Sequence, residues 1–180
     1  APAAQAANAS WTGTTDSTWA TGTNWSAATP GTGDTATFND VGNGNTFLDL
    51  GAGVTINTIL FDTANAAAYT IGAGAVGSQT LTLNNGGAIT MTSSVVNSQV
   101  INAALGRGTD GTTQTFTLTN GSTVGPTLTV AGGITGSTGA GVKTLAVAGA
   151  GDTTLSGIIG NGTTGTVGLL TAVTTRRPTP

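Results

Sequence analysis

Short runs in which apolar residues alternate with threonine recur along most of this chain. Thr80-Leu81-Thr82-Leu83 and Thr127-Leu128-Thr129-Val130 are two examples, and Gly or Asn separates most of the runs. A period of two is typical of a β-strand that buries one of its faces. Gly and Thr, the residues that dominate the chain, are poor helix formers, so long helices are not expected. The alternation therefore predicts an all-β protein.

The spacing of the runs indicates how the strands are arranged. Phe61 and Leu81 are 20 residues apart, as are Leu81 and Ile101, and TLTLNNGGAIT at 80–90 is similar to TLTVAGGIT at 127–135. A period near 20 that holds several short strands is typical of a solenoid, in which each coil stacks on the previous one. We expect about six coils, at a rise of about 4.8 Å per coil.

Each coil needs corners, where the backbone leaves one strand and enters the next. Gly and Asn adopt the positive φ values that such corners require more easily than other residues do. The expected corners are Gly72, the Asn84–Gly87 stretch, the Gly132–Gly133 pair and Gly149.

The alternative architecture is an antiparallel β-sandwich, such as a jelly roll. It would need tight hairpins, for which Asn43-Gly44, Asp110-Gly111, Asn120-Gly121 and Asn161-Gly162 are suitable sequences. The regular spacing favours the solenoid over the sandwich, and both remain open at the level of sequence.

The chain divides into four segments. We expect a flexible leader at 1–10, an N-terminal Trp-rich cap at 11–44, solenoid coils at 45–172 and a polar Pro/Thr tail at 173–180. All three tryptophans, Trp11, Trp19 and Trp25, lie in the second segment. Large rings in a Gly-rich stretch favour a cap that covers one end of the core. The alternative is an aromatic platform that binds carbohydrate, with Tyr69 as a further ligand.

Several pieces of the sequence resemble one known family. They are WTG at 11–13, NWS at 24–26, PGTGDTATF at 30–38, VTINTILFD at 54–62, YTIGAG at 69–74, LTLNNGGAIT at 81–90 and TLAVAGAGDTTLSGIIG at 144–160. In these pieces and their order the chain resembles the autotransporter-associated β-strand repeat proteins, which are exported surface or extracellular proteins. The resemblance implies a right-handed parallel β-helix with a passenger or stalk role at the cell surface.

The residue types that most enzymes need are missing. The chain has no His, no Cys and no Glu, and its seven acidic residues are all Asp. Nucleophilic triads and thiolate metal sites are therefore excluded. Asp40 and Asp62, 22 residues apart, are the nearest approach to a stacked carboxylate pair. We expect no catalytic residues, no metal and no cofactor.

Charge and hydropathy limit the partners and the location. Only 6% of the residues are charged and no basic patch exists, so nucleic acid is not an expected partner. No apolar run approaches the ~20 residues of a membrane-spanning helix. The chain begins with the small residues Ala1-Pro2-Ala3-Ala4 and without Met, which favours a mature form after signal-peptide removal and hence secretion.

These observations favour a non-enzymatic extracellular structural protein. Open solenoid ends expose strand edges that invite another chain, so we expect a subunit that self-associates head to tail in a surface fibre, layer or stalk. The alternative is an adhesin or a module that binds polysaccharide through Trp11, Trp19, Trp25 and Tyr69.

Overall fold

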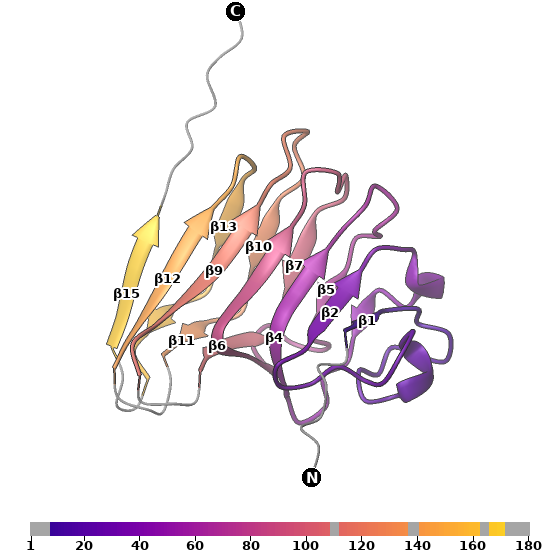
Figure 1. Ribbon diagram of the computed structural model, residues 1–180, viewed down its shortest axis with the longest axis horizontal. Coiled ribbons are helices and arrows are strands. Elements are labelled where there is room, and N and C mark those ends of the chain that lie inside the picture. The colour runs from indigo at the N-terminus through magenta and orange to yellow at the C-terminus, as the bar shows by residue number, and fades with distance from the viewer. Residues whose placement is uncertain (1–7, 109–111, 137–140, 163–165, 172–180) are drawn as a thin grey trace, which may run out of the picture.

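The computed structural model describes residues 8–108, 112–136, 141–162 and 166–171. About 44% of the chain is strand, and the strands wind into a parallel β-solenoid of about five turns. Figure 1 shows the strands stacked in order from the N-terminal end to the C-terminal end of the molecule.

The elements follow one another with short connections. The strands are β1 (Ala9–Ser10), β2 (Thr35–Phe38), β3 (Phe47–Leu48), β4 (Val54–Phe61), β5 (Thr70–Ile71), β6 (Thr80–Met91), β7 (Gln99–Ile101), β8 (Ala104–Arg107), β9 (Gln114–Asn120), β10 (Leu128–Val130), β11 (Ile134–Thr135), β12 (Val142–Ala148), β13 (Thr153–Leu155), β14 (Ile159–Gly160) and β15 (Thr166–Thr171). Two short 3-10 helices, η1 (Gly22–Asn24) and η2 (Gly42–Gly44), lie near the N-terminus.

The pairing divides the solenoid into three sides. The first side consists of β2, the C-terminal parts of β4 and β6, β9, β12 and β15. The second side is β3-β5-β7-β10-β13. The third side consists of the N-terminal parts of β4 and β6, then β8, β11 and β14. One coil therefore contributes one strand to each side.

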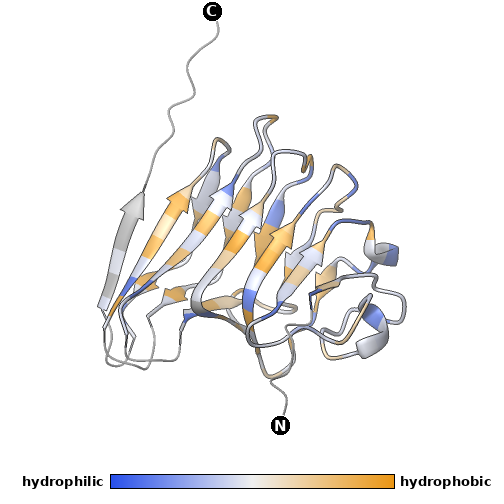
Figure 2. Cartoon of the chain, in the orientation of Figure 1, coloured by the Kyte–Doolittle hydropathy of each residue, from blue (hydrophilic) through white to orange (hydrophobic). Residues whose placement is uncertain are grey.

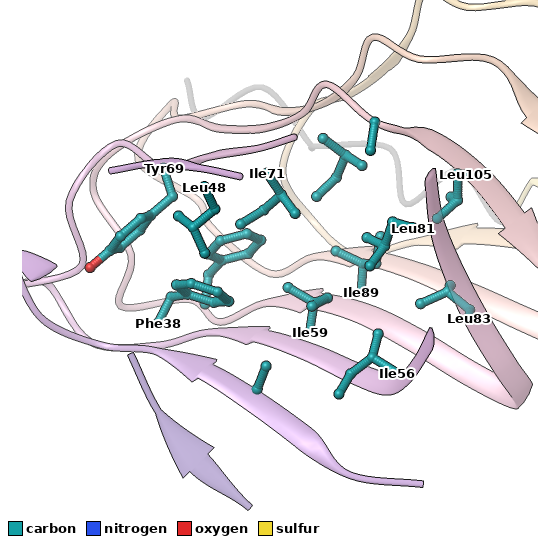
Figure 3. Close-up of a cluster of buried hydrophobic side chains, with 14 of the residues drawn as sticks. Phe38, Leu48, Ile56, Ile59, Tyr69, Ile71, Leu81, Leu83, Ile89 and Leu105 are labelled. Carbon is teal, nitrogen blue, oxygen red and sulfur yellow. The ribbon is translucent and has the colours of Figure 1, made fainter. Parts of the chain in front are cut away.

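Inward-facing side chains form columns through the coils. On the second side Leu48, Ile71, Ile101 and Val130 occupy equivalent positions, and all four are fully buried. Side chains from the other sides, such as Ile89 and Leu105, point toward this column (Figure 3). Because every inward position of a strand meets its counterpart in the next coil, the alternation predicted from the sequence produces one continuous apolar core.

The coils are longer than the 20 residues expected. Thr70 pairs with Val100, 30 positions later. Val100 pairs with Thr129, 29 positions later. Shorter coils occur at the two ends, where Phe47 pairs with Thr70 and Thr129 pairs with Thr154, 23 and 25 positions later. The chain therefore makes about five turns rather than six.

The antiparallel sandwich is excluded. Every pairing between named strands is parallel, and among the described residues the one antiparallel bridge joins Trp11 to Trp25. Asn43 and Gly44 lie in η2, and Asn120-Gly121 ends β9 without starting a hairpin. Asp110 and Gly111 lie outside the described residues.

The expected corner glycines serve two different purposes. Gly72, Gly86 and Gly149 have positive φ values of 107°, 72° and 105°, as predicted. Gly132 does not, but a Cβ at this position would lie 2.0 Å from the carbonyl oxygen of Ala103 in the preceding coil. Its lack of a side chain is therefore required by the close approach of two coils, and not by the backbone conformation.

The segment boundaries also shift. Ala9 and Ser10 form β1, which pairs with β2. The last two residues of the expected leader, 1–10, therefore belong to the β-sheet. β2 lies within the expected cap segment 11–44 but pairs with β4, so the coils begin before residue 45. The tail at 173–180 and the first seven residues lie outside the described residues.

The close approach at Gly132 gives a direct test of the coil stacking. Gly132→Ala is expected to lower the free energy of unfolding by about 2 kcal/mol, because the new methyl group overlaps the backbone at Ala103. Urea denaturation followed by circular dichroism measures this change. Gly160→Ala is the matched control, since a Cβ there meets nothing within 4 Å. Equal stabilities of the two variants would contradict this stacking.

Candidate functional site

The four aromatic residues considered as ligand-binding candidates all lie in the core. Trp11, Trp19 and Trp25 are 1%, 3% and 5% exposed, and Tyr69 is fully buried. They gather at the N-terminal end of the solenoid, around Phe38 of β2. The structure therefore brings all four candidates together, but with their ring faces inside the protein.

The rings form a closely packed cluster. The ring centroids of Trp11 and Trp25 are 5.0 Å apart and those of Trp19 and Trp25 are 4.7 Å apart, both in edge-to-face geometry. Phe38 lies 4.9 Å from Tyr69 and 5.4 Å from Phe61 between ring centroids. Such contacts add stability beyond simple burial. The cluster joins the 11–25 segment to the first coils.

The polar atoms of these rings already have partners. The indole N–H of Trp11 donates to the Asn45 carbonyl (3.0 Å), that of Trp19 to the Pro30 carbonyl (3.1 Å), and that of Trp25 to the Trp19 carbonyl (2.8 Å). The Tyr69 hydroxyl donates to the carbonyl of Asp40 at 2.5 Å. A sugar ring stacked on these residues would find neither an exposed ring face nor an unpaired donor.

Burial also changes the chemistry of Tyr69. Desolvation, with a smaller contribution from the charge of Asp40, raises the pKa of the phenol well above its usual value. The hydroxyl is therefore neutral at physiological pH and is held as a donor to the backbone.

Asn24 fixes the loop that carries the three tryptophans. Its side-chain oxygen accepts from the backbone N–H groups of Thr15 and Asp16, and its amide nitrogen donates to the Asp16 carboxylate and to the Thr18 carbonyl. Asp16 also accepts from the backbone N–H of Thr18 at 2.7 Å. These hydrogen bonds, first that of Thr18 and then that of Asn24, lower the pKa of Asp16. These polar contacts thus hold the loop in place.

The carboxylates of Asp34, Asp49 and Asp62 also accept hydrogen bonds from backbone or side-chain groups. Asp34 accepts from the backbone N–H of Gly31 at 2.8 Å, and Asp62 accepts from the backbone of Thr63 and the hydroxyl of Thr92. The pKa of Asp49 is lowered by the backbone N–H of Gly51 and then by the side chain of Gln79.

Asp40 and Asp62, considered as a stacked carboxylate pair, do not occupy equivalent positions in neighbouring coils. The residue that pairs with Phe61 is Phe38, so Asp40 and Asp62 are offset by one position in the ladder. Asp40 accepts from the backbone N–H of Val41 at 2.7 Å. Within the described part of the chain, no group of three or more Asp side chains is placed to hold a metal ion.

Sequence reasoning missed two basic residues inside the core. Arg107 and Lys143 are both fully buried. Arg107 donates to the carbonyls of Thr135 and Lys143, and its Nη2 nitrogen has no hydrogen-bond partner among the described residues. Burial lowers the pKa of Arg107 to about 10. The alternation in the sequence could have revealed this burial. Arg107 lies two positions after the buried Leu105, and Lys143 two positions before the buried Leu145, so both share the inward face of their strands.

Comparison with known proteins gives no assignment. No family model, no curated protein and no solved structure matches this chain. In the described residues no helix is long and apolar enough to cross a membrane.

The burial of Tyr69 predicts a loss of stability at high pH. Its phenol ionises near pH 10.0 in the unfolded chain and at higher pH in the folded protein, so the free energy of unfolding falls as the pH rises past about 10. Tyr69→Phe removes this dependence. Urea denaturation between pH 8 and about 11 should therefore show a smaller fall for the variant than for the wild type.

The comparison with Tyr69→Phe has an internal control. Arg107 titrates near the same pH, but it is present in both proteins, so its effect cancels in the difference between them. Parallel curves for the two proteins would show that Tyr69 ionises equally easily in the folded and unfolded states.

Proposed function

We propose that this chain is a non-enzymatic structural protein of the cell surface or the extracellular space, and that its solenoid builds a self-associating fibre, layer or stalk. The observation that carries the proposal is the uninterrupted parallel ladder of the three sides. Such a ladder produces a stiff rod, and each further coil lengthens it by about 4.8 Å. The resemblance to autotransporter-associated β-strand repeats supports an exported location.

The chemistry of the described residues supports a structural role. Buried amide side chains hold the coils together, as in the bonds of Gln99 to the backbone of Tyr69, Ala67 and Asn97. The carboxylates of Asp16, Asp34 and Asp62 are occupied in the same way. A general acid or base needs a positioned group that can reach a substrate, and these groups face the backbone.

The two ends of the ladder differ. At the N-terminal end the two-residue strand β1 is followed by the Trp11–Trp25 bridge, and the backbone N–H of Ser10 is bonded to the Ser26 hydroxyl. At the other end β13, β14 and β15 pair, among the described residues, with strands of the preceding coil, and no aromatic cluster lies beside them there. A further coil of the same chain or a neighbouring copy can extend that edge. Head-to-tail association would then set this edge against the aromatic end of the next copy.

The adhesin alternative has less support. A carbohydrate-binding platform needs exposed rings, whereas Trp11, Trp19 and Trp25 are buried and their N–H groups are bonded.

Self-association is tested by sedimentation velocity over a range of concentrations and by electron microscopy of the same samples. We expect the average mass to rise with concentration and elongated or layered particles to be visible. A monodisperse monomer at every concentration would contradict the proposal.

Tryptophan fluorescence separates the two candidate functions. The structural role predicts blue-shifted emission that soluble polysaccharides neither quench nor shift, because the indoles are within the core. A saturable change in emission with one polysaccharide would favour the adhesin.

A further inference from the structure

The first side of the solenoid presents a broad outer face made of hydroxyl and small apolar side chains. Its outward positions alternate with the buried residues of β2, β4, β6, β9 and β12. Val142, at the start of β12, is an exposed apolar position at the margin, and the other twelve are Thr35, Thr37, Thr58, Leu60, Ala88, Thr90, Thr115, Thr117, Thr119, Thr144, Ala146 and Ala148. We call these twelve residues the hydroxyl face.

The ladder arranges the hydroxyl face as a regular array. One column runs Thr37, Leu60, Thr90, Thr119 and Ala148, and a second runs Thr58, Ala88, Thr117 and Ala146. Neighbours within a column are about 4.8 Å apart, and the two columns are about 7 Å apart along the strands. In Figure 1 these strands lie side by side at the front, and no connecting segment crosses them.

The hydroxyl face carries no charge. Asp34 and Asp40 lie outside the two ends of β2, Asp62 follows β4, and Arg107 and Lys143 point into the core. In Figure 2 these strands are mostly white to orange, with blue at a few amide-bearing positions. A second copy can therefore approach this face without like-charge repulsion.

Other classes of partner fit this face less well. Nucleic acid and anionic lipid need cations, which the face lacks. The aromatic rings on which a polysaccharide stacks are absent, because the twelve residues include no aromatic side chain. The hydroxyl face of a second copy is a suitable partner for this face. Threonine hydroxyls both donate and accept hydrogen bonds, and the threonine methyl groups pack closely.

The size of the face sets the strength of such a contact. Five strands at about 4.8 Å, each about 17 Å long, give about 400 Å² on each copy. A stable pair needs about 800 Å² on each partner. One contact is therefore weak, and association becomes strong only where many copies, or longer rods, make the same contact repeatedly.

We propose that the hydroxyl face is the surface through which copies of this chain pack side by side into a sheet-like layer. This inference rests on the proposed self-association and names the surface that mediates its lateral part. Each solenoid contributes the same array, so the contact between two copies is self-complementary.

The test introduces charge at the centre of the face. Thr90→Lys combined with Thr117→Lys places two cations where two copies would meet, and both side chains point away from the core. Thr70→Lys combined with Thr129→Lys is the matched control, since these threonines occupy outward positions of the second side. Equal urea midpoints for the two variants establish that both fold.

Sedimentation velocity and electron microscopy then decide the matter. We expect the wild type and the control to form layers with the same concentration dependence, and the face variant to associate at least tenfold more weakly. Layers that persist in the face variant, or that the control disrupts equally, would overturn the proposal. Wild-type filaments that are only one solenoid wide would overturn the lateral contact but leave self-association standing. A wild-type monomer at all concentrations would overturn both.

Discussion

Parallel pairing of each strand with its equivalents in the next coils places nearly every side chain of this protein. The backbone ladder aligns Leu48 with Ile71, Ile101 and Val130, so a residue that fits one coil must also fit its neighbours. Inward side chains meet the equivalent residue of the next coil every ~4.8 Å, so most inward positions are apolar, although Leu128 pairs with Gln99 and Leu83 with Arg107. This constraint accounts for the repeated use of Leu, Ile and Val inside.

Backbone groups at the corners lie outside the strand pairing, so many of their hydrogen bonds come from amide side chains instead. Gln79 accepts from the backbone of Leu50 and Ala73, and Asn120 donates to the carbonyls of Pro126 and Asp152. A buried backbone group without a partner costs free energy, so each corner needs such a bond. Asn102, which donates to the carbonyls of Gly72 and Gly74, does the same for another coil. These amides therefore belong to the scaffold as much as the apolar core does.

The sequence predicted the strands, because these depend on local alternation, and the repeated runs favoured a parallel solenoid without excluding an antiparallel sandwich. It did not predict the length of the coils, because that length depends on loops that vary from coil to coil. The similar stretches at 80–90 and 127–135 illustrate the difficulty. Leu81 pairs with Leu105 on the third side, whereas Leu128 pairs with Gln99 on the second side. Similar strands on different sides gave a false period.

The three tryptophans were expected to lie together in an N-terminal cap, and they pack against one another there, whereas the meeting of Tyr69 with the same cluster was not predicted. Clustering of Trp11, Trp19 and Trp25 in 11–44 favours a cap but is also compatible with a binding platform. What separates the two is the carbonyl partner of each indole N–H, and those partners come from Asn45, Pro30 and Trp19. Only the fold brings Asn45 to Trp11, 34 positions away.

The low charge of the chain follows from the same ladder. A column of outward Lys or Asp would place like charges about 4.8 Å apart in every coil, where their repulsion accumulates along the rod. Threonine avoids this repulsion, favours the strand conformation and still hydrates the surface. The two basic residues of the coils lie inside instead, where Arg107 reaches the backbone carbonyl of Lys143. Outward threonines stack on the outward residues of the next coil without charge repulsion. The same uncharged face does not repel the same face of another copy, so the low charge favours both the fold and the proposed lateral contact.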